Sequence, residues 1–336
     1  MKKGDTLHPA KRILIVGCGE LGSRHLQAVA TLPEVAEIEV VDPRPEGLQL
    51  GRERVAEVEE RKPSIDYRWL SSIEEAHKGG DLCIVATQAD VRCEVVRRVA
   101  ESLGYNSFLL EKMVAQSVRD YEGLMEFSRE KGLSVWVNCK TRAYPFHKRL
   151  KSLLDPREPL VLVDVGGNHG LANNGIHVAD LFVFYDETDS IKSGGCCVDP
   201  VLHPSKRGNG LFELSGLLQG YTQKGSRLTI LFARDHVAPD HLSIASSRYR
   251  CVVDHMSRWA WESDASTGWE WRPIPFEGNL LVSSMTKQFA ADILSSGTCE
   301  LPNLKECFPA HRFILTELRP HFSKLLKTEV ERLPVT

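Results

Sequence analysis

Apolar and polar positions follow a regular pattern along the first third of the chain. Short apolar runs, which predict buried strands, alternate with longer segments whose apolar positions recur at helical spacing. In the segment 116–131, for example, Val118, Tyr121 and Met125 fall on one face of a helix. The predicted strands are 13–16, 38–41, 82–86, 108–110 and 133–137. This alternation predicts a parallel sheet that is covered by helices on both faces.

The pattern changes after about residue 155. Apolar runs at 160–165 and 177–185 are followed by short strand-like segments from 190 to 275 and by helix-like segments at 281–295 and 304–326. Turn residues at 264–268 separate two pairs of tryptophans, which predicts a hairpin. We therefore expect an α/β fold with a doubly wound parallel sheet in residues 1–140. An α+β domain with a mostly antiparallel, open sheet is expected in residues 141–336.

Composition narrows the classes of partner. The length of 336 residues is enough for about two domains. A net charge of −3 and the lack of a long Lys/Arg run argue against nucleic acid as a partner. No apolar run approaches the roughly 20 residues of a membrane-spanning helix, so no membrane association is expected. Residues 1–10 lack the apolar segment of a signal peptide and are expected to form a frayed tail.

The cysteines indicate a reducing environment. All nine are irregularly spaced, and the chain contains no C-x-x-C motif, so we expect free thiols rather than a disulfide framework. No Cys/His group has the spacing of metal ligands, and we therefore expect no metal site. The vicinal residues Cys196 and Cys197 are interpreted as buried or incidental thiols. These features favour a cytoplasmic location.

The stretch RILIVGCGELGSRH, residues 12–25, contains the motif G-x-G-x-x-G at Gly17, Gly19 and Gly22. Alone this motif is common, but here a predicted strand precedes it, a predicted helix follows it, and Asp42 ends the next apolar run. In such a turn the glycines allow a tight bend, close approach to a pyrophosphate and close helix–strand packing. The N–H groups at the helix start face the phosphate charge. The stretch predicts dinucleotide binding, and the alternative is a glycine turn without a ligand.

The position of Asp42 favours NAD(H) as the cofactor. A carboxylate there accepts hydrogen bonds from the adenosine ribose, and it repels a 2′-phosphate. Arg44, two positions later, softens this preference and leaves NADP(H) as an alternative. The full set of predicted cofactor-binding residues is Gly17, Gly19, Glu20, Leu21, Gly22, Asp42, Arg44, Thr87, Glu111 and Lys112.

Two further stretches carry candidate chemistry. In FLLEKMVA, a predicted strand ends at Glu111 and Lys112, and the ligand crevice of a doubly wound sheet lies beyond the carboxyl ends of its strands. In GGNHGLANNGIHVADLF, Asn173 and His177 are one helical turn apart, and Asp180 follows three positions later. A lysine at the strand end and a histidine on a helix are therefore the candidate reactive groups.

With these stretches in view, the chain resembles the Gfo/Idh/MocA family of oxidoreductases over nearly its whole length. GCGELGSRH is similar to the opening turn of that family, LEKM to its Glu-Lys-Pro motif and NNGIHVAD to its Asp-x-Gly-x-His-x-x-Asp segment. The closing DILSSGTCELPNLKECFPAHRFI is similar to its last helix, turn and helix. The resemblance implies a Rossmann domain and the NAD(P)-dependent oxidation or reduction of a sugar, nucleotide sugar or cyclitol.

The resemblance also implies roles for individual residues. Lys112 and His177 take the positions of the catalytic lysine and histidine, and a group titrating near neutral pH suits the accompanying proton transfer. A lysine ammonium can also stabilise charge that develops on the carbonyl oxygen. The implied substrate-binding residues are Asn173, Arg142, Tyr144 and Asp180. Asp180 has the alternative role of fixing the helix, and Pro145 is expected to start a helix.

The sequence departs from the family pattern at three places. Asn173 replaces an aspartate, Met113 replaces the motif proline, and Thr87-Gln88 replaces Thr-Pro, with Arg92 near a common histidine. These departures keep two other functions open: a non-catalytic regulator that binds NAD and a sugar, and a reductase of a non-sugar substrate such as an imine or a tetrapyrrole. By analogy with the family, the second domain is expected to bind the substrate and to form a homodimer or homotetramer. The four tryptophans are expected to serve sheet packing or this interface, and the alternative is a platform on which a sugar stacks.

Overall fold

The computed structural model describes residues 10–167, 170–276 and 281–336. Residues 1–9, which hold most of the expected tail, lie outside this part of the chain. The chain forms two compact units, each built from three stretches. The first unit comprises Met1–Glu111, Leu124–Asn138 and Asn279–Leu301, and the second comprises Lys112–Gly123, Cys139–Gly278 and Pro302–Thr336. A late segment of the chain therefore completes the unit that contains the glycine turn.

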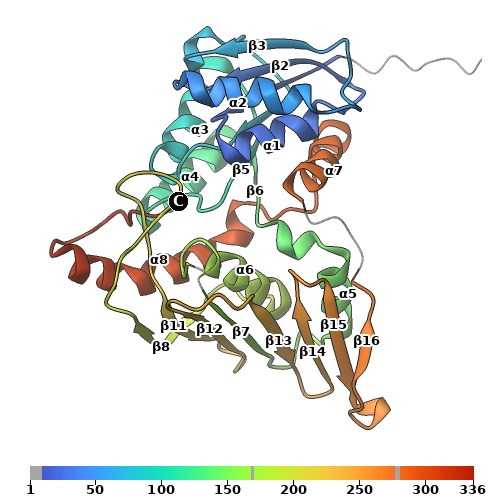
Figure 1. Ribbon diagram of the computed structural model, residues 1–336, viewed down its shortest axis with the longest axis vertical. Helices are drawn as coiled ribbons and strands as arrows, with labels where there is room; N and C mark the ends of the chain where they lie inside the picture. The colour runs from blue at the N-terminus through green and yellow to red at the C-terminus, as the bar shows by residue number, and fades with distance from the viewer. Residues whose placement is uncertain (1–9, 168–169, 277–280) are drawn as a thin grey trace, which may run out of the picture. The chain divides into compact units, whose positions relative to one another are not determined.

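The first unit is built on a six-stranded parallel sheet (Figure 1). Its strands are β1 (Lys11–Val16), β2 (Val35–Val41), β3 (Asp66–Leu70), β4 (Leu82–Val85), β5 (Ser107–Leu110) and β6 (Ser134–Val137). Their spatial order is β3-β2-β1-β4-β5-β6, and every pair is parallel. This order has the reversal beside β1 that places a ligand crevice at the carboxyl ends of β1 and β4. The doubly wound sheet predicted from the apolar runs is confirmed.

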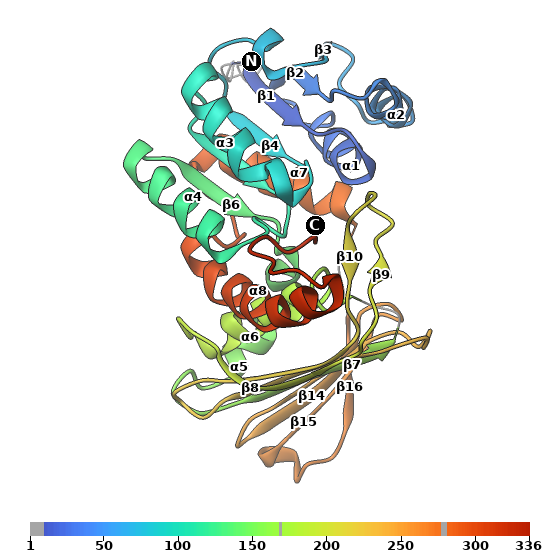
Figure 2. The ribbon, with the colours of Figure 1, turned by 90° about the vertical axis from the view of Figure 1, so that its left-hand side faces the viewer.

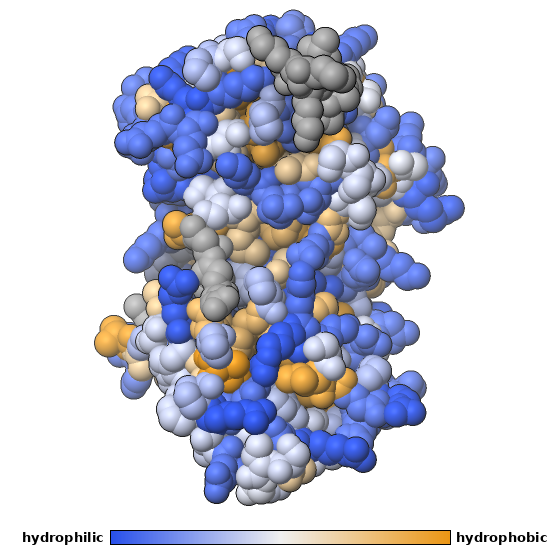
Figure 3. Space-filling view, turned by 90° about the vertical axis from the view of Figure 1, so that its right-hand side faces the viewer, coloured by the Kyte–Doolittle hydropathy of each residue, from blue (hydrophilic) through white to orange (hydrophobic). Residues whose placement is uncertain are grey.

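Helices cover the sheet of the first unit on both faces. The helices are α1 (Glu20–Val29), α2 (Pro45–Ala56), α3 (Ala89–Leu103), α7 (Val282–Ser296) and, from Leu124 onward, α4 (Val118–Lys131), with a 3₁₀ turn η1 (Ile73–Glu75). α1 and α2 lie on one face and α3 on the other (Figure 2). α7 packs against α1, although about 250 residues separate them in the chain. The surface of this unit, in the upper part of Figure 3, is mainly hydrophilic.

The second unit contains an eight-stranded sheet of mixed direction. Its strands are β7 (Val161–Gly167), β8 (Lys192–Val198), β11 (Gly216–Tyr221), β12 (Arg227–Ala233), β13 (His241–Ala245), β14 (Tyr249–Asp254), β15 (Trp259–Asp264) and β16 (Arg272–Ile274). The order is β16-β15-β14-β13-β7-β12-β11-β8, and within it only β7 and β12 pair in parallel. A short ribbon of β9 (His203–Pro204) and β10 (Phe212–Glu213) stands apart. The mostly antiparallel open sheet is confirmed.

Three helices belong to the second unit, among the residues that the structure describes. They are α5 (Pro145–Leu153), α6 (Gly175–Asp186) and α8 (Leu304–Leu326), with 3₁₀ turns η2 (Lys140–Ala143) and η3 (Ala265–Thr267). α6 packs against α8 and β12, and all three helices lie on the same face of the sheet (Figures 1 and 2). Pro145 occupies the first turn of α5, as expected. α6 is almost entirely buried, which fits its uniformly apolar sequence.

Two strands of the second sheet, β15 and the edge strand β8, expose aromatic and thiol side chains, respectively. Trp259 and Trp261 on β15 are 40% and 42% exposed, while the alternate residues Ala260 and Glu262 are buried. The predicted hairpin is confirmed, with η3 between β15 and β16. Cys196 and Cys197 on β8 are free and exposed, so they are not buried thiols, and the other interpretation, that they are incidental thiols, stays a prediction. None of the described helices combines the length and the apolar character that a membrane crossing requires.

Candidate active site

The glycine turn has the close packing that its spacing predicts. Gly17 has a φ of +89°, which favours glycine, and a Cβ on Gly22 would lie 1.8 Å from the Gly17 carbonyl oxygen. Gly19 is the N-cap of α1, and no described side chain caps the helix there. The nearest atom to a Cβ on Gly19 would be an Arg44 nitrogen at 3.5 Å, so this side of the turn is open. The first N–H groups of α1 are therefore free to bind a phosphate.

Asp42 ties the second strand to the glycine turn. Its carboxylate is 2% exposed and accepts hydrogen bonds from the backbone N–H groups of Cys18, at 2.8 Å, and Arg44, at 2.9 Å. The Arg44 guanidinium lies 3.2 Å from the same carboxylate, and this contact raises the pKa of Arg44. A carboxylate has about four acceptor positions, so ribose hydroxyl groups can still donate to Asp42. The exposed Arg44 guanidinium beside Asp42 is a positive charge of the kind that accommodates a 2′-phosphate.

Three other predicted cofactor residues surround the turn in the first unit. Thr87 follows β4, and its buried hydroxyl has no hydrogen-bond partner among the described residues. An unsatisfied buried hydroxyl is costly, so this group fits a contact with a bound molecule. Glu20 is exposed and forms an ion pair with Arg54, while Leu21 is partly buried. The turn, Asp42 and Thr87 together fit a dinucleotide such as NAD(H).

Glu111 belongs to a buried hydrogen-bond network in the first unit. Its Oε1 lies 2.9 Å from His25 Nε2 and accepts a hydrogen bond from Asn138 at 2.6 Å. His25 Nδ1 lies 2.9 Å from the Thr286 hydroxyl on α7. All four side chains are at most 4% exposed. The network joins α1, α7 and the ends of β5 and β6, and a contact of Glu111 with cofactor stays a prediction.

Lys112 contacts Asn173 of the second predicted motif, and both residues belong to the second unit. Lys112 lies two residues after β5 and is 5% exposed. Its ammonium donates to the Asn173 carbonyl at 2.9 Å and lies 3.4 Å from the Asn173 Oδ1. These residues are 61 positions apart in the sequence. The structure therefore brings the two motifs together.

His177 lies in the first turn of α6 and is half-buried. Its backbone N–H donates to the Asn174 carbonyl at 3.0 Å, so the helix begins with a tight turn. Asn173 precedes the N-cap, Asn174, rather than lying inside the helix as its spacing suggested. The turn that contacts Lys112 through Asn173 thus leads directly into the helix that carries His177.

Arg142 and Asp180 form a buried ion pair in the second unit. They are 7% and 0% exposed, and the guanidinium donates to both oxygens of the carboxylate. The Cys307 thiol lies 3.4 Å from Asp180 and 3.3 Å from the Cys139 sulfur. Burial raises the pKa of Asp180, while the charge and hydrogen bonds of Arg142 oppose this rise. This geometry supports the alternative in which Asp180 fixes α6, and substrate binding by either residue stays a prediction.

Tyr144 is 6% exposed and lies beside a pair of histidines that sequence reasoning missed. Its hydroxyl accepts a hydrogen bond from Lys140 at 2.7 Å. His147 stacks on Tyr144, and its Nε2 lies 2.7 Å from the Nε2 of His255. Burial, together with the charge of His255, holds the pKa of His147 well below its ordinary value. The contact of Tyr144 with substrate stays a prediction.

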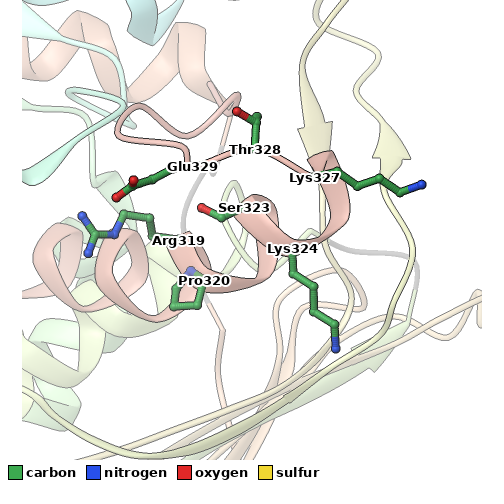
Figure 4. Close-up of a pocket in the computed structure, with 7 residues that line it drawn as sticks. All are labelled: Arg319, Pro320, Ser323, Lys324, Lys327, Thr328 and Glu329. Atoms are coloured by element: carbon green, nitrogen blue, oxygen red, sulfur yellow. The ribbon is translucent and has the colours of Figure 1, made fainter.

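A surface hollow at the C-terminal end of α8 contains none of the predicted site residues. It is lined by Arg319, Pro320, Ser323, Lys324, Lys327, Thr328 and Glu329 (Figure 4). The side chains of Lys324 and Lys327 point in different directions from the helix. The C-terminal end of a helix also carries partial negative charge. The lining of the hollow combines three basic side chains with the carboxylate of Glu329, and the hollow is not part of the predicted site.

Comparisons with known proteins agree with this geometry. A comparison with curated protein sequences finds no match. Among solved structures, the chain is similar to UDP-N-acetylglucosamine 3-dehydrogenase GnnA from Acidithiobacillus ferrooxidans, with 15% identity and a TM-score of 0.68 over 97% of this chain and 98% of that one. It is also similar to KijD10, a 3-ketoreductase from Actinomadura kijaniata in complex with NADP and TDP-benzene, with 15% identity and a TM-score of 0.69 over 93% and 97% of the two chains.

A third solved structure with this fold is an oxidoreductase from Agrobacterium radiobacter in complex with NAD+, L-tartaric acid and magnesium. It has 14% identity and a TM-score of 0.71, over 90% of this chain and 94% of that one. At identities of 14–15%, the similarity to these three structures shows the fold alone. In sequence, residues 11–139 match the Gfo/Idh/MocA family, which is described as an oxidoreductase family with an NAD-binding Rossmann fold. The family match covers the part of the chain that carries the glycine turn and the parallel sheet, residues 11–139.

Proposed function

We propose that the protein transfers a hydride between NAD(H) and a secondary alcohol or ketone of a sugar, nucleotide sugar or cyclitol. The observation that carries the proposal is the buried contact between Lys112 and Asn173, which joins the strand-end lysine to the turn before His177. NADP(H) is the alternative cofactor, and the exposed guanidinium of Arg44 supports it. The nicotinamide of the bound cofactor supplies or accepts the hydride.

The residues of the second unit have separate parts in this proposal. The Lys112 ammonium donates a hydrogen bond to the reacting oxygen and so stabilises the charge that develops there. His177 takes up or releases the proton of the alcohol, because an imidazole titrates near neutral pH. The Asn173 Oδ1 lies near Lys112, and its Nδ2 group is then the donor for a substrate hydroxyl. Arg142, Tyr144 and Asp180 are the further proposed substrate-binding residues.

Several observations support the finer parts of the proposal. The names of GnnA and KijD10 refer to a nucleotide sugar and to a TDP-linked ligand, which supports a nucleotide sugar as substrate. Nine free cysteines support a reducing, cytoplasmic location. The exposed tryptophans of β15 support a homodimer or homotetramer that covers this sheet. Size-exclusion chromatography with light scattering is expected to give twice or four times the monomer mass.

The experiment that tests the proposed function measures turnover and cofactor binding in parallel. Wild-type protein is assayed for NADH absorbance change with a panel of sugars, nucleotide sugars and cyclitols, while NADH binding is followed by fluorescence. We expect turnover of at least one class. Lys112→Ala is expected to lose about 100-fold or more of this rate with NADH binding nearly intact. The control, Lys324→Ala, replaces an exposed lysine on α8 and is expected to keep full activity.

Three outcomes would contradict the proposal or one of its parts. NADH binding with ligand binding but without any turnover would favour the non-catalytic regulator. Full activity of Lys112→Ala would remove the lysine from the reaction. Turnover of an imine or a tetrapyrrole, with none of the sugar panel, would favour the reductase of a non-sugar substrate.

A further inference from the structure

Glu213 is an acidic residue that no sequence motif singles out. It ends β10 and accepts hydrogen bonds from two successive backbone N–H groups, those of Ala172 and Asn173, each at 3.1 Å. The neighbouring Leu171 N–H donates to the Leu214 carbonyl at 2.9 Å. A Cβ on Gly170 would lie 2.0 Å from the Glu213 carboxylate, so this close approach requires glycine. The turn that precedes α6 is thus held in place by hydrogen bonds to Glu213 and Leu214, at the end of β10.

Glu213 and Lys112 both bind the backbone of Asn173, Glu213 at its N–H group and Lys112 at its carbonyl group. Glu213 binds the Asn173 N–H, and the Asn173 carbonyl accepts a hydrogen bond from the Lys112 ammonium at 2.9 Å. Lys112 is 5% exposed, and a buried ammonium requires a compensating negative charge nearby. Asn173 carries no charge. The carboxylate of Glu213 binds the Asn173 N–H group, and it also interacts electrostatically with the Lys112 ammonium.

We propose that Glu213 is a positioning residue for Lys112, which it holds through the backbone of Asn173 and whose charge it balances. This inference rests on the proposed function for its catalytic consequence, but the contacts themselves do not depend on it. In this arrangement the charge that Asn173 lacks comes from a ribbon 40 residues further along the chain. Glu213 does not touch the reacting atoms, and it acts through the orientation of the ammonium.

The surroundings of Glu213 make its charge sensitive to pH. Burial raises the pKa of Glu213 to about 7, against the lowering effects of Lys112, the two backbone N–H groups and Arg207. Arg207 lies in the loop between β9 and β10, and His203 is the register partner of Glu213 on β9. The carboxylate is therefore ionised above about pH 7, where it accepts both N–H groups as an anion.

The first test compares Glu213→Gln with wild-type protein in the turnover assay. We expect kcat to fall about 10- to 100-fold, because a small displacement of a catalytic group has an effect of this size, while KM changes little. The wild-type pH profile is expected to rise through about pH 7, and this rise is expected to be lost in Glu213→Gln. Glu213→Asp keeps the charge and is expected to recover part of the rate together with the rise. An unchanged kcat and profile in Glu213→Gln would overturn the proposal.

The second test does not depend on turnover. Lys112 is methylated with formaldehyde and cyanoborohydride at several pH values, and its modification is followed by mass spectrometry. Without the nearby negative charge the ammonium releases its proton more readily, so we expect severalfold faster methylation of Lys112 in Glu213→Gln. NADH binding is expected to be unchanged. If Lys112 is methylated at the same rate in Glu213→Gln and in wild-type protein, the positioning role of Glu213 is overturned, whether or not a substrate has been found. If Lys112 is methylated faster in Glu213→Gln but no substrate is turned over, only the proposed function is contradicted.

A matched control separates this role from general disturbance of the ribbon. Asp199 follows β8, and its carboxylate accepts a hydrogen bond at 2.6 Å from Ser215, two positions after Glu213. Asp199→Asn therefore removes a hydrogen-bonded carboxylate from the same region. We expect it to keep the wild-type pH profile and the wild-type methylation of Lys112. The same changes in Asp199→Asn as in Glu213→Gln would show that the effect is structural and would overturn the proposal.

Discussion

The glycine turn of the first unit and the Lys112 site of the second are built by opposite means. In the turn, Gly17 and Gly22 allow backbone to lie against backbone because neither has a side chain. In the second unit, side chains buried among one another hold the site, and Lys112, Asn173 and Glu213 are joined by hydrogen bonds. The first site is open to a ligand, whereas in the second the ammonium of Lys112 and the carboxylate of Glu213 already hold hydrogen bonds to the segment at Asn173.

This difference teaches what each site tolerates. A turn made of glycines depends on volume, so one added methyl group is enough to disturb it. A site made of buried charges depends on partners, so a change of charge at constant volume is enough. Each prediction below changes one of these properties and leaves the other nearly constant.

The largest effect on stability is expected from the buried pair of the second unit. Asp180→Asn keeps the volume of the side chain and leaves the Arg142 guanidinium buried without its counter-ion. We expect the free energy of unfolding to fall by about 3–5 kcal/mol, measured by urea denaturation. The control is Asp155→Asn, which breaks the solvent-screened surface pair with Arg157 and is expected to change the free energy of unfolding far less. Equal effects of the two substitutions would show that the buried pair is not special.

The glycine turn is expected to respond to volume alone. In Gly22→Ala, the new methyl group would meet the Gly17 carbonyl at 1.8 Å, so strand and helix must separate. We expect a loss of about 1–3 kcal/mol in stability and a large loss of NADH affinity, measured by thermal unfolding and fluorescence titration. Gly79→Ala is no neutral control, because Gly79 has a φ of +72°. Gly175→Ala, whose Cβ would have no neighbour closer than 3.6 Å, is the suitable one. Unchanged NADH affinity in Gly22→Ala would contradict the proposed role of the turn.

Charge beside the turn is expected to set cofactor choice. Asp42→Asn preserves shape and removes the negative charge that opposes a 2′-phosphate, and it leaves Arg44 unpaired. We expect the ratio of NADPH to NADH affinity to rise about tenfold, which corresponds to about 1.4 kcal/mol. Arg44→Ala is expected to shift the ratio in the opposite direction. Fluorescence titration of both cofactors provides the measurement, and a ratio that stays constant in both variants would exclude this pair from cofactor selection.

The smallest effect concerns the pH dependence of stability. The folded state keeps the proton of Glu213 up to about pH 7, whereas the unfolded chain releases it near the ordinary value of 4.5. Between these values the folded state binds more protons, so this group lowers the free energy of unfolding as pH rises. We expect a decrease of about 1 kcal/mol, smaller than the full shift implies because the side chain is partly exposed to screening solvent. Urea denaturation from pH 5 to pH 8 should show this decrease in wild-type protein and lose it in Glu213→Gln.

Much of the first unit could be predicted from local sequence. Buried parallel strands are short apolar runs, and the turn between β1 and α1 is marked by its glycines. The strand β3 was missed because its sequence, DYRWL, is polar and partly exposed at the sheet edge. α7 was predicted as a helix, but its packing against α1 leaves no local signal.

The second site was predicted only in part. The spacing of motifs identified Lys112, Asn173 and His177, because a strand end and a helix start carry local signals. Glu213 and Cys307 were missed, since each reaches the site from a distant segment and its contacts are tertiary ones that leave no local signal in the sequence. Arg142 and Asp180 were singled out, yet their pairing with each other is a tertiary contact that no spacing in the sequence specifies.

Hydride transfer with Lys112 at the reacting oxygen is tested most directly by following the hydrogen itself. NADH deuterated at C4 of the nicotinamide is incubated with a panel of keto sugars and keto nucleotide sugars, and the products are analysed by mass spectrometry. We predict that wild-type protein transfers deuterium to a product carbon, and that Lys112→Ala transfers it about 100-fold or more slowly while it binds NADH as well. Equal transfer by the two proteins, or bound NADH with no labelled product from any ketone, would contradict the account.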